Sequence, residues 1–543
     1  MGSPAERVRR RSPAANAIFA CFLLPPIAIA GLAIAVPGIM APAVADDAFF
    51  FIRYARNFLE VGRFAWNTDE AASFANTSQL YQFLIASVQA AVGYNPVRIL
   101  AIASQVPFAL CVLTVLAASV RMIREEPSLP PLRAAAILLL AGTAIGFSPK
   151  FAQAAWSGMD TTLAALAAAL YVALADGIEQ RGRRAQFAIL ALSGWAMILA
   201  RPELGLLAVA TPLALGLAHR RVEPWILPGL AGLGGLLLLS LCLAWLSYGD
   251  PLPLPFYVKS LGLTGYGDAA FARYRFGNLE ELYLLFRDHA VLVLLVAASG
   301  AAAFRHRPVW WGLIGGSLAV AAYQALVNAV PITGGGARFF LPVYPILVLA
   351  MVRAALAAAS GPSLIGPLLI ACVLVQAALL VPPYGRTLWE RLRQAPEAWA
   401  IREDARATML LNREGQREKW PALERMEELP EGCAIATTEM GLIGALYPRL
   451  RLVDLSGLVD PRLKDGLDPR WLIEEARPDI LFPGTAEFYW SVRLDKEPGY
   501  RAAYADLRVF ERMAPWPIAI RADSPCGQAY ATILAEEERR LAR

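Results

Sequence analysis

The sequence predicts a polytopic, mainly α-helical membrane protein with a smaller α/β domain at its C-terminal end. Of the 543 residues, 57% are hydrophobic and 17% are charged, whereas soluble domains average roughly 45–50% apolar and 25% charged residues. The apolar residues gather in blocks of about 16 to 28 residues, the length that crosses a bilayer core. From about residue 383 onward, short strand-like runs alternate with polar and helical segments, which favours an α/β unit.

The first apolar block follows a short basic segment. Residues 1–11 contain four arginines, and an apolar run extends from about residue 14 to 44. The apolar region of a signal peptide is about 7–15 residues long, so we interpret this longer run as an uncleaved first transmembrane helix. Further apolar blocks cover residues 97–120, 132–148, 160–178, 186–200, 203–218, 224–247, 289–304, 309–330, 341–358 and 364–382. Together they predict about eleven crossings.

Positive charge predicts the topology. The block at residues 77–93 is short and carries Gln79, Gln82 and Gln89. If it does not cross, the arginine clusters between blocks fall on the cytoplasmic side with the N-terminus, as the positive-inside rule requires. These clusters are Arg121/Arg124, Arg181/Arg183/Arg184, Arg220/Arg221 and Arg305/Arg307. We therefore expect a re-entrant or interfacial helix at this block.

This topology divides the chain into two domains. A transmembrane domain covers residues 1–382, with periplasmic loops at 46–76 and 249–288, and a soluble periplasmic α/β domain covers residues 383–543. In the second domain, residues 433–438, 450–455 and 479–482 have strand-like patterns, and residues 471–476 look helical. Strands that alternate with helices predict a small, partly parallel sheet.

Composition also argues against two classes of function. No basic stripe of the kind that binds nucleic acid is present, and His219, His289 and His306 lack the spacing of zinc ligands. Cys433 and Cys526 lie in the polar C-terminal region. They could form a disulfide in an oxidising compartment, or remain two free thiols.

The most informative segment begins with two adjacent carboxylates. Asp46 and Asp47 stand where the first apolar run ends, and ionisable groups at membrane depth are costly and usually functional. Helical spacing then places on one face Asp46, Phe50, Arg53 and Asn57. We expect a helix along the outer membrane surface that holds a carboxylate near a guanidinium. Alternatively, the two aspartates could simply cap this helix.

Three later segments place cations beside short outer loops. They are Arg201-Pro-Glu203, Phe256-Tyr257-Val-Lys259 and Gly334-Gly-Gly336-Ala-Arg338. Each has a plainer interpretation: an interfacial anchor for Arg201, a solvated loop residue for Lys259 and a helix start for Arg338. Together, however, they put cations on the same side as the acidic pair. A carboxylate that takes the acceptor's proton, and cations that stabilise a leaving phosphate, are what displacing a sugar from a lipid phosphate requires.

The order of these motifs resembles the GT-C superfamily of membrane glycosyltransferases. It is most similar to cell-wall arabinofuranosyltransferases of the AftB type and their bacterial relatives. The matching elements are Asp46–Asn57, Gly62–Asn67, Asn76–Ser78, Trp156–Thr161, Ala200–Glu203, Phe256–Lys259, Gly336–Phe339 and Val453–Asp460.

The resemblance implies an inverting transferase that uses a polyprenyl-phosphate sugar, with arabinofuranose as one candidate sugar. The acceptor would be a cell-envelope glycan, lipid or protein. Asp46 would be the catalytic base, and Asp47 would orient it or help to bind a cation. The residues implied at the donor phosphate are Arg53, Tyr257, Lys259 and Arg338, and those implied to support the site are Arg56, Asp160, Arg201 and Glu203.

The resemblance also implies a multi-pass protein of the bacterial inner membrane, with its active site and C-terminal domain outside the cytoplasm. Its partners would be the lipid-linked donor, the envelope acceptor and membrane lipids, and no nucleic acid. No cofactor is required by any motif, although Asp46 and Asp47 could offer oxygen ligands to Mg²⁺ or Mn²⁺.

Two other functions are compatible with charges in a membrane bundle. A transporter or flippase for an anionic or lipid-linked substrate also places charges there. Such proteins commonly contain repeated helix bundles, and the sequence shows no such repeat. A structural subunit of an envelope complex is the third alternative, and it would not need clustered outer charges.

Overall fold

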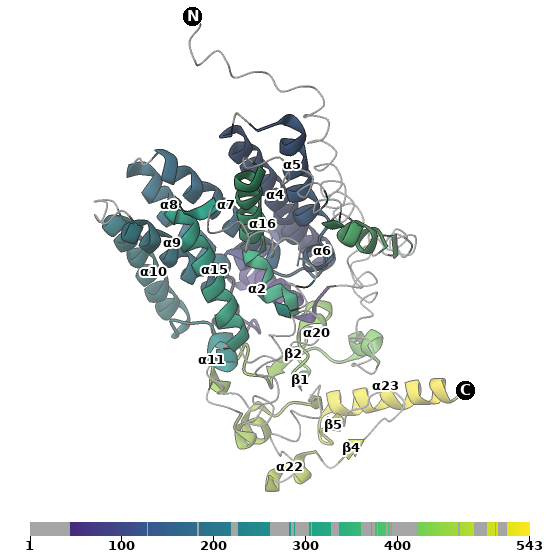
Figure 1. Ribbon diagram of the computed structural model, residues 1–543. Coiled ribbons are helices and arrows are strands. Elements are labelled where there is room, and N and C mark those ends of the chain that lie inside the picture. Colours follow the sequence, from purple (N-terminus) through teal and green to yellow (C-terminus); the bar gives the residue numbers. More distant parts are fainter. Residues whose placement is uncertain are drawn as a thin grey trace, which may run out of the picture.

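The computed structural model describes residues 44–126, 129–181, 184–218, 226–260, 303–305, 307–326, 336–359, 378–386, 422–464, 467–482, 497–504, 506–508 and 518–543, together with a few isolated positions between residues 282 and 393. Within these residues, apolar helices form a bundle, and a small sheet with its helices lies at one end of that bundle (Figure 1). The sequence-predicted fold class is therefore confirmed as mainly helical with a C-terminal α/β part.

Most of the apolar blocks are helices. The bundle contains α4 (Pro96–Arg124), α5 (Pro131–Gly146), α6 (Pro149–Trp156), α7 (Thr161–Arg181), α8 (Arg184–Ala200), α9 (Gly205–Ala218), α10 (Ile226–Tyr248), α15 (Pro308–Leu326) and α16 (Tyr344–Ala359). Five helical segments of the described chain are long and apolar enough to span a bilayer, and the bent pair α5 and α6 would make a sixth. Three expected crossing segments lie mostly outside the described residues: 14–44, 289–304 and 364–382.

Two shorter helices precede the bundle. α2 (Asp46–Val61) ends at Gly62, whose φ of 73° lets its amide cap the carbonyl of Phe58. α3 (Gln79–Val92) has 14 residues, fewer than the roughly 20 that a transmembrane helix needs.

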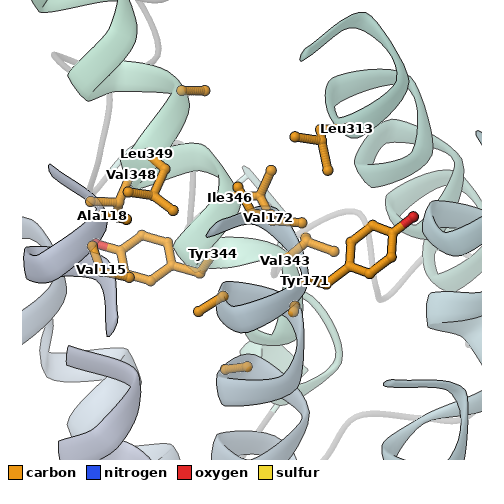
Figure 2. Packing of buried hydrophobic residues seen from close by; sticks show 14 of the residues in the cluster. Val115, Ala118, Tyr171, Val172, Leu313, Val343, Tyr344, Ile346, Val348 and Leu349 are labelled. Carbon is orange, nitrogen blue, oxygen red and sulfur yellow. The ribbon is translucent and has the colours of Figure 1, made fainter. Parts of the chain in front are cut away.

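Side-chain size sets how closely the bundle helices approach. Gly312 and Gly316 of α15 face α9, where an added Cβ would lie 2.6 Å from the Cα of Thr211 and 2.7 Å from the Cα of Leu207. Small residues four positions apart allow this contact between membrane helices. Where α4, α7, α15 and α16 meet, buried aliphatic side chains surround Tyr171 and Tyr344 (Figure 2).

A buried group of charges lies in the half of the bundle remote from α2. Asp176 of α7 accepts hydrogen bonds from Arg353 of α16 at 2.7 and 2.8 Å, from Arg121 of α4 at 2.9 Å, and from Trp310 of α15 at 2.9 Å. Arg353 also pairs with Glu125 at 2.8 Å. These contacts join four helices, and Asp176 is fully buried, so the group fixes the relative positions of the helix ends.

The C-terminal part contains a five-stranded sheet in the order β2-β1-β3-β5-β4. Its strands are β1 (Ala434–Thr437), β2 (Arg451–Asp454), β3 (Ile480–Phe482), β4 (Asp506–Arg508) and β5 (Ile518–Ile520). β1 pairs in parallel with β2 and β3, whereas β5 pairs antiparallel with β3 and β4. The predicted strands and the partly parallel sheet are confirmed, and the predicted helical segment is a π-helical turn (Trp471–Ala476).

Among the described residues, four short helices and one helix of 18 residues accompany this sheet. They are η7 (Leu423–Glu428), α20 (Gly441–Leu446), η8 (Pro461–Leu463), α22 (Pro498–Ala503) and α23 (Pro525–Ala542). Cys433, just before β1, forms a disulfide with Cys526 of α23, with a Cα–Cα distance of 5.8 Å. This settles the choice between a disulfide and two free thiols.

One hydrophobic core crosses from the membrane helices into the C-terminal part. Buried side chains of α2, α3 and the start of α4 pack in the same cluster as those of β1, α20 and α23. The helix α2 is therefore enclosed between the bundle and the sheet, rather than lying uncovered on the membrane surface. That enclosure determines the surroundings of Asp46 and Asp47.

Candidate active site

The acidic pair starts α2, next to the loop between α6 and α7. The amide of Ala45 donates to the carbonyl of Ser157 at 2.9 Å, which holds the first residue before the helix. Ala45 is the N-cap residue, and its side chain makes no capping hydrogen bond. Both aspartates lie in the first turn of α2, where acidic residues stabilise a helix start, and both carboxylates also have partners on other elements.

Asp46 is bound by the C-terminal domain. Its Oδ2 accepts a hydrogen bond from the amide of Gly441 at 3.0 Å, and its Oδ1 accepts one from the amide of Leu442 at 2.7 Å. Both amides belong to the first residues of α20, which follows β1 after a short loop. Two amide donors fix the plane of the carboxylate, so the direction in which Asp46 can accept a further proton is set by the fold.

The surroundings of Asp46 also change its acidity. Burial and the neighbouring carboxylates of Glu439 and Asp47 raise its pKa from an ordinary 3.8 to about 7, although the two amide hydrogen bonds act in the opposite direction. A general base works best when its pKa lies near the operating pH. Asp46 therefore has the acidity that proton abstraction near neutral pH requires.

Asp47 forms an ion pair with Arg338, as η5 (Gly336–Phe339) reaches the start of α2. The Nη2 of Arg338 lies 2.9 Å from Oδ2 of Asp47. The Asp47 side chain is 39% exposed and that of Arg338 is 21% exposed. A ligand can therefore reach both groups, and an anion could take the guanidinium from Asp47 or share it.

A line of charged and aromatic side chains extends from this pair. The ring centre of Phe339 lies 5.0 Å from the Arg338 guanidinium carbon and 5.6 Å from that of Arg201, within the range of cation–π attraction. Arg201 donates to both oxygens of Asp160 at 2.7 and 3.1 Å and to Glu203 at 3.3 Å. Gln324 of α15 donates to Glu203 at 2.8 Å. The predicted supporting residues Asp160, Arg201 and Glu203 are thus brought together behind Arg338.

Arg53 lies elsewhere and is almost wholly buried. Its guanidinium donates to Trp66 O at 2.7 Å, Asn67 Oδ1 at 2.8 Å, Leu450 O at 2.9 Å and Gly444 O at 3.2 Å. Burial lowers its pKa to about 10, so it stays charged at neutral pH. Because four of its five N–H donors are used on these oxygens, this geometry argues for a structural role instead of the phosphate-binding role expected from the sequence. Arg56 pairs with Glu60 on the same helix at 3.1 Å.

The segment that carries Tyr257 and Lys259 is the short helix α11 (Leu254–Ser260). The Nζ of Lys464, from the C-terminal domain, lies 4.0 Å from the Tyr257 ring centre and pairs with Asp250. The phenol is therefore engaged by a cation of the other domain. The side chain of Lys259 lies outside the described residues, as do Gly334 and Gly335 of the glycine run and most of the loop 261–288.

Sequence reasoning missed the contribution of the C-terminal domain. Glu439, Gly441 and Leu442 all act on Asp46, yet about 395 residues separate them from it. The strand-then-helix pattern of residues 433–446 predicts a turn there. Nothing in that pattern indicates which surface the turn would meet.

The described residues offer few side-chain groups that could hold a metal ion. Within the described residues, the one group of three compactly placed His, Cys, Asp or Glu ligand atoms is Cys433, Asp479 and Cys526. The cysteines are joined in a disulfide, and Asp479 accepts hydrogen bonds from Ala434 and Ser524, so this group does not fit a metal. In that part of the chain, Asp46 and Asp47 have no third such ligand close enough to complete a group of this kind.

Comparison with solved structures identifies the fold. The chain is similar to ArnT from Cupriavidus metallidurans bound to undecaprenyl phosphate, with a TM-score of 0.54 and 14% identity over 92% of this chain and 98% of that one. It matches the apo state of ArnT with a TM-score of 0.53 and 15% identity, over 93% and 98% of the two chains.

A third structure is the arabinosyltransferase EmbB from Mycobacterium smegmatis. It gives a TM-score of 0.35 and 15% identity over 78% of this chain and 44% of that one. No family model and no curated protein sequence matches the chain. The likeness to ArnT therefore concerns the fold.

Proposed function

We propose that this chain, which has the GT-C membrane fold, is an inverting glycosyltransferase that uses a polyprenyl-phosphate sugar as donor. The observation that carries the proposal is the partly exposed ion pair of Asp47 and Arg338 beside Asp46, a carboxylate whose pKa is raised to about 7. A base and a phosphate-binding cation thus lie together at one end of the helical bundle. The ArnT structure that holds undecaprenyl phosphate supports the same class of lipid carrier here.

The reaction needs the acceptor hydroxyl, the anomeric carbon of the donor sugar and the leaving phosphate oxygen in one line. An acceptor hydroxyl attacks the anomeric carbon of the donor sugar, while Asp46 takes the hydroxyl proton. The bond from the anomeric carbon to the phosphate oxygen breaks with its electron pair, and polyprenyl phosphate leaves. A single displacement inverts the anomeric configuration.

Arg338 stabilises the charge that develops on the leaving phosphate. In the geometry described above, Arg338 is held by Asp47, which places the cation before the donor arrives. Behind it, Phe339 and the Arg201–Asp160 pair support the guanidinium. Arg53 is left out of the donor site for the reasons given above. Tyr257 and Lys259 remain proposed donor contacts on α11.

The site and the C-terminal domain are proposed to lie outside the cytoplasm of a bacterial inner membrane. The Cys433–Cys526 disulfide supports this orientation, because disulfides persist in oxidising compartments. The positive-inside distribution of arginines supports it independently. In this arrangement, residues 1–382 form the membrane domain and residues 383–543 the extracytoplasmic one, and the acceptor is a glycan, lipid or protein of the envelope.

Sugar transfer in nanodiscs tests the proposal. A panel of radiolabelled polyprenyl-phosphate sugars, including the arabinofuranose donor, is supplied with envelope extract as the acceptor source. Wild type is compared with Asp46→Asn and Asp47→Asn, and with Asp69→Asn as a control on an exposed carboxylate of the same loop.

Transfer from one donor that both site variants abolish and the control retains would support the proposal and name the sugar. Transfer that survives both site variants would remove the acidic pair from the mechanism. Donor movement across the bilayer without transfer would favour a flippase.

A further inference from the structure

The start of α20 approaches the start of α2 more closely than any side chain would allow. A Cβ added to Gly441 would overlap the backbone oxygen of Asp46 and would lie 2.7 Å from its Oδ2. Real Cβ atoms do not come within 3.0 Å of a neighbour. Glycine at position 441 therefore permits the contact through which its own amide, and that of Leu442, reach the Asp46 carboxylate.

This contact belongs to a rigid attachment between the two parts of the chain. Arg53 of α2 binds the carbonyls of Gly444 and Leu450. Asn67 exchanges two hydrogen bonds with the backbone of Leu452 at 2.9 and 3.0 Å. The shared hydrophobic core lies around these bonds. These bonds and the shared core hold α20 in a fixed position against Asp46.

We propose that the C-terminal domain is a part of the catalytic site, in which Gly441 is a positioning residue that holds the Asp46 carboxylate through the start of α20. The inference rests on the proposed function, in which Asp46 is the base. The inference goes beyond the proposed function because it gives the C-terminal domain a part in catalysis as well as in binding an acceptor. Removing or displacing the domain would disable the base itself.

The charged groups around Asp46 come from three elements. Glu439 lies in the loop before α20, two residues from Gly441, and its charge raises the pKa of Asp46, as does that of Asp47, its neighbour on α2. Arg338, from η5, reaches the site through its pair with Asp47. α20 itself carries no titratable side chain, since its sequence is Gly-Leu-Ile-Gly-Ala-Leu. Changing Glu439 therefore alters the charge beside Asp46 without altering the two amides that hold it.

Three variants of the full chain in nanodiscs test the inference. Gly441→Ala is expected to lower kcat about 100-fold with little change in the donor KM, because a misplacement of about 1 Å at a reacting group costs roughly that factor. Gly499→Ala is the matched control, since its Cβ would make ordinary contact at 3.5 Å with Ile473 in the same domain. Glu439→Gln is expected to move the acidic limb of the kcat/KM profile to lower pH, because one carboxylate that raises the Asp46 pKa is lost.

A second measurement does not depend on activity. Hydrogen exchange of the peptide that contains Gly441 and Leu442 should be slow in the wild type and faster in Asp46→Ala. If Gly441→Ala does not fold, the pH profile of Glu439→Gln and this exchange measurement decide the case. The inference is overturned if folded Gly441→Ala keeps the kcat of Gly499→Ala, if Glu439→Gln leaves the acidic limb in place, or if Asp46→Ala does not change the exchange. Absence of transfer in the wild type, with the exchange effect present, would instead refute the proposed function and leave only the contact.

Discussion

Arg338 and Asp47 are 291 residues apart in the chain, and yet Nη2 of the arginine lies 2.9 Å from Oδ2 of the aspartate. The pair links η5, which precedes α16, to the first turn of α2. The pair is partly exposed to solvent, unlike the Arg201–Asp160 pair behind it, both members of which are nearly fully buried. The exposed pair can exchange partners with a ligand, whereas the buried pair supports it.

Replacing Arg338 should lower kcat/KM for the donor. Because a charge-assisted hydrogen bond contributes roughly 1.5–3 kcal/mol, Arg338→Gln is expected to lower kcat/KM about 10- to 100-fold. Arg338→Lys should recover part of this loss, since lysine keeps the charge but not the planar fork. Steady-state transfer with varied donor measures the effect, and Arg63→Gln, on an exposed arginine of the first loop, is the control. Equal activity of Arg338→Gln and Arg63→Gln would contradict the assignment.

Activity should depend on pH through Asp46. Its pKa is raised to about 7 by burial and by Glu439 and Asp47, and only the deprotonated carboxylate can accept a proton. The value of kcat/KM is therefore expected to be constant above this pH and to fall tenfold for each pH unit well below it. The profile is measured on the wild type in reconstituted membranes. An acidic limb near pH 4 would mean that the carboxylate of the working base is not perturbed.

A substitution of Arg53 distinguishes its structural role from phosphate binding. Arg53→Met leaves several buried carbonyl oxygens without a donor, and each such group costs about 1–3 kcal/mol. We expect a large loss of thermal stability in detergent and faster proteolysis of the C-terminal domain. Donor affinity, measured on the fraction that remains folded, should be unchanged. Normal stability with lost donor binding would return Arg53 to the donor site.

The buried charge group around Asp176 should matter for stability alone. Asp176→Ala removes the partner of Arg353 and Arg121, and breaking a buried ion pair in this way costs about 3–5 kcal/mol. Asp176 lies 16 positions beyond Asp160 on α7, about 24 Å along the helix, so the transfer rate per folded molecule should persist. Thermal unfolding and transfer assays on the same preparation separate the two effects. Loss of kcat at normal stability would point to a functional role for this group.

The disulfide should be detectable as a linked peptide pair, and its removal should lower the stability of the protein. Non-reducing mass mapping of the purified protein should find one linked peptide pair that contains Cys433 and Cys526. Cys526→Ser should lower stability by about 2–4 kcal/mol, the range typical of a natural disulfide. Two alkylated free thiols in the wild type would show that the bond does not form in the cell.

Local pattern was sufficient to predict many elements. The apolar blocks predict the helices of the bundle, and the spacing after Asp46 predicts α2. The alternating pattern from residue 433 predicts β1, β2 and β3, while β4 and β5 are not indicated by any clear pattern. The arginine clusters predict that Asp47 and Arg338 lie on the same side of the membrane, but they do not predict that the two residues pair. These features depend on neighbours in the sequence or on the side of the bilayer, and both can be read from residue order.

The sequence by itself therefore determined the fold class and the set of charged residues available to a site. Only the tertiary structure decided their partners. It placed Asp46 against the amides of Gly441 and Leu442, Arg53 in a buried network of carbonyls, and Asp176 among Arg121 and Arg353. Helical and strand periodicity specifies which face of an element is apolar, but it does not specify which distant surface will cover that face. That choice depends on the path of the chain and on the close packing of side chains hundreds of residues apart.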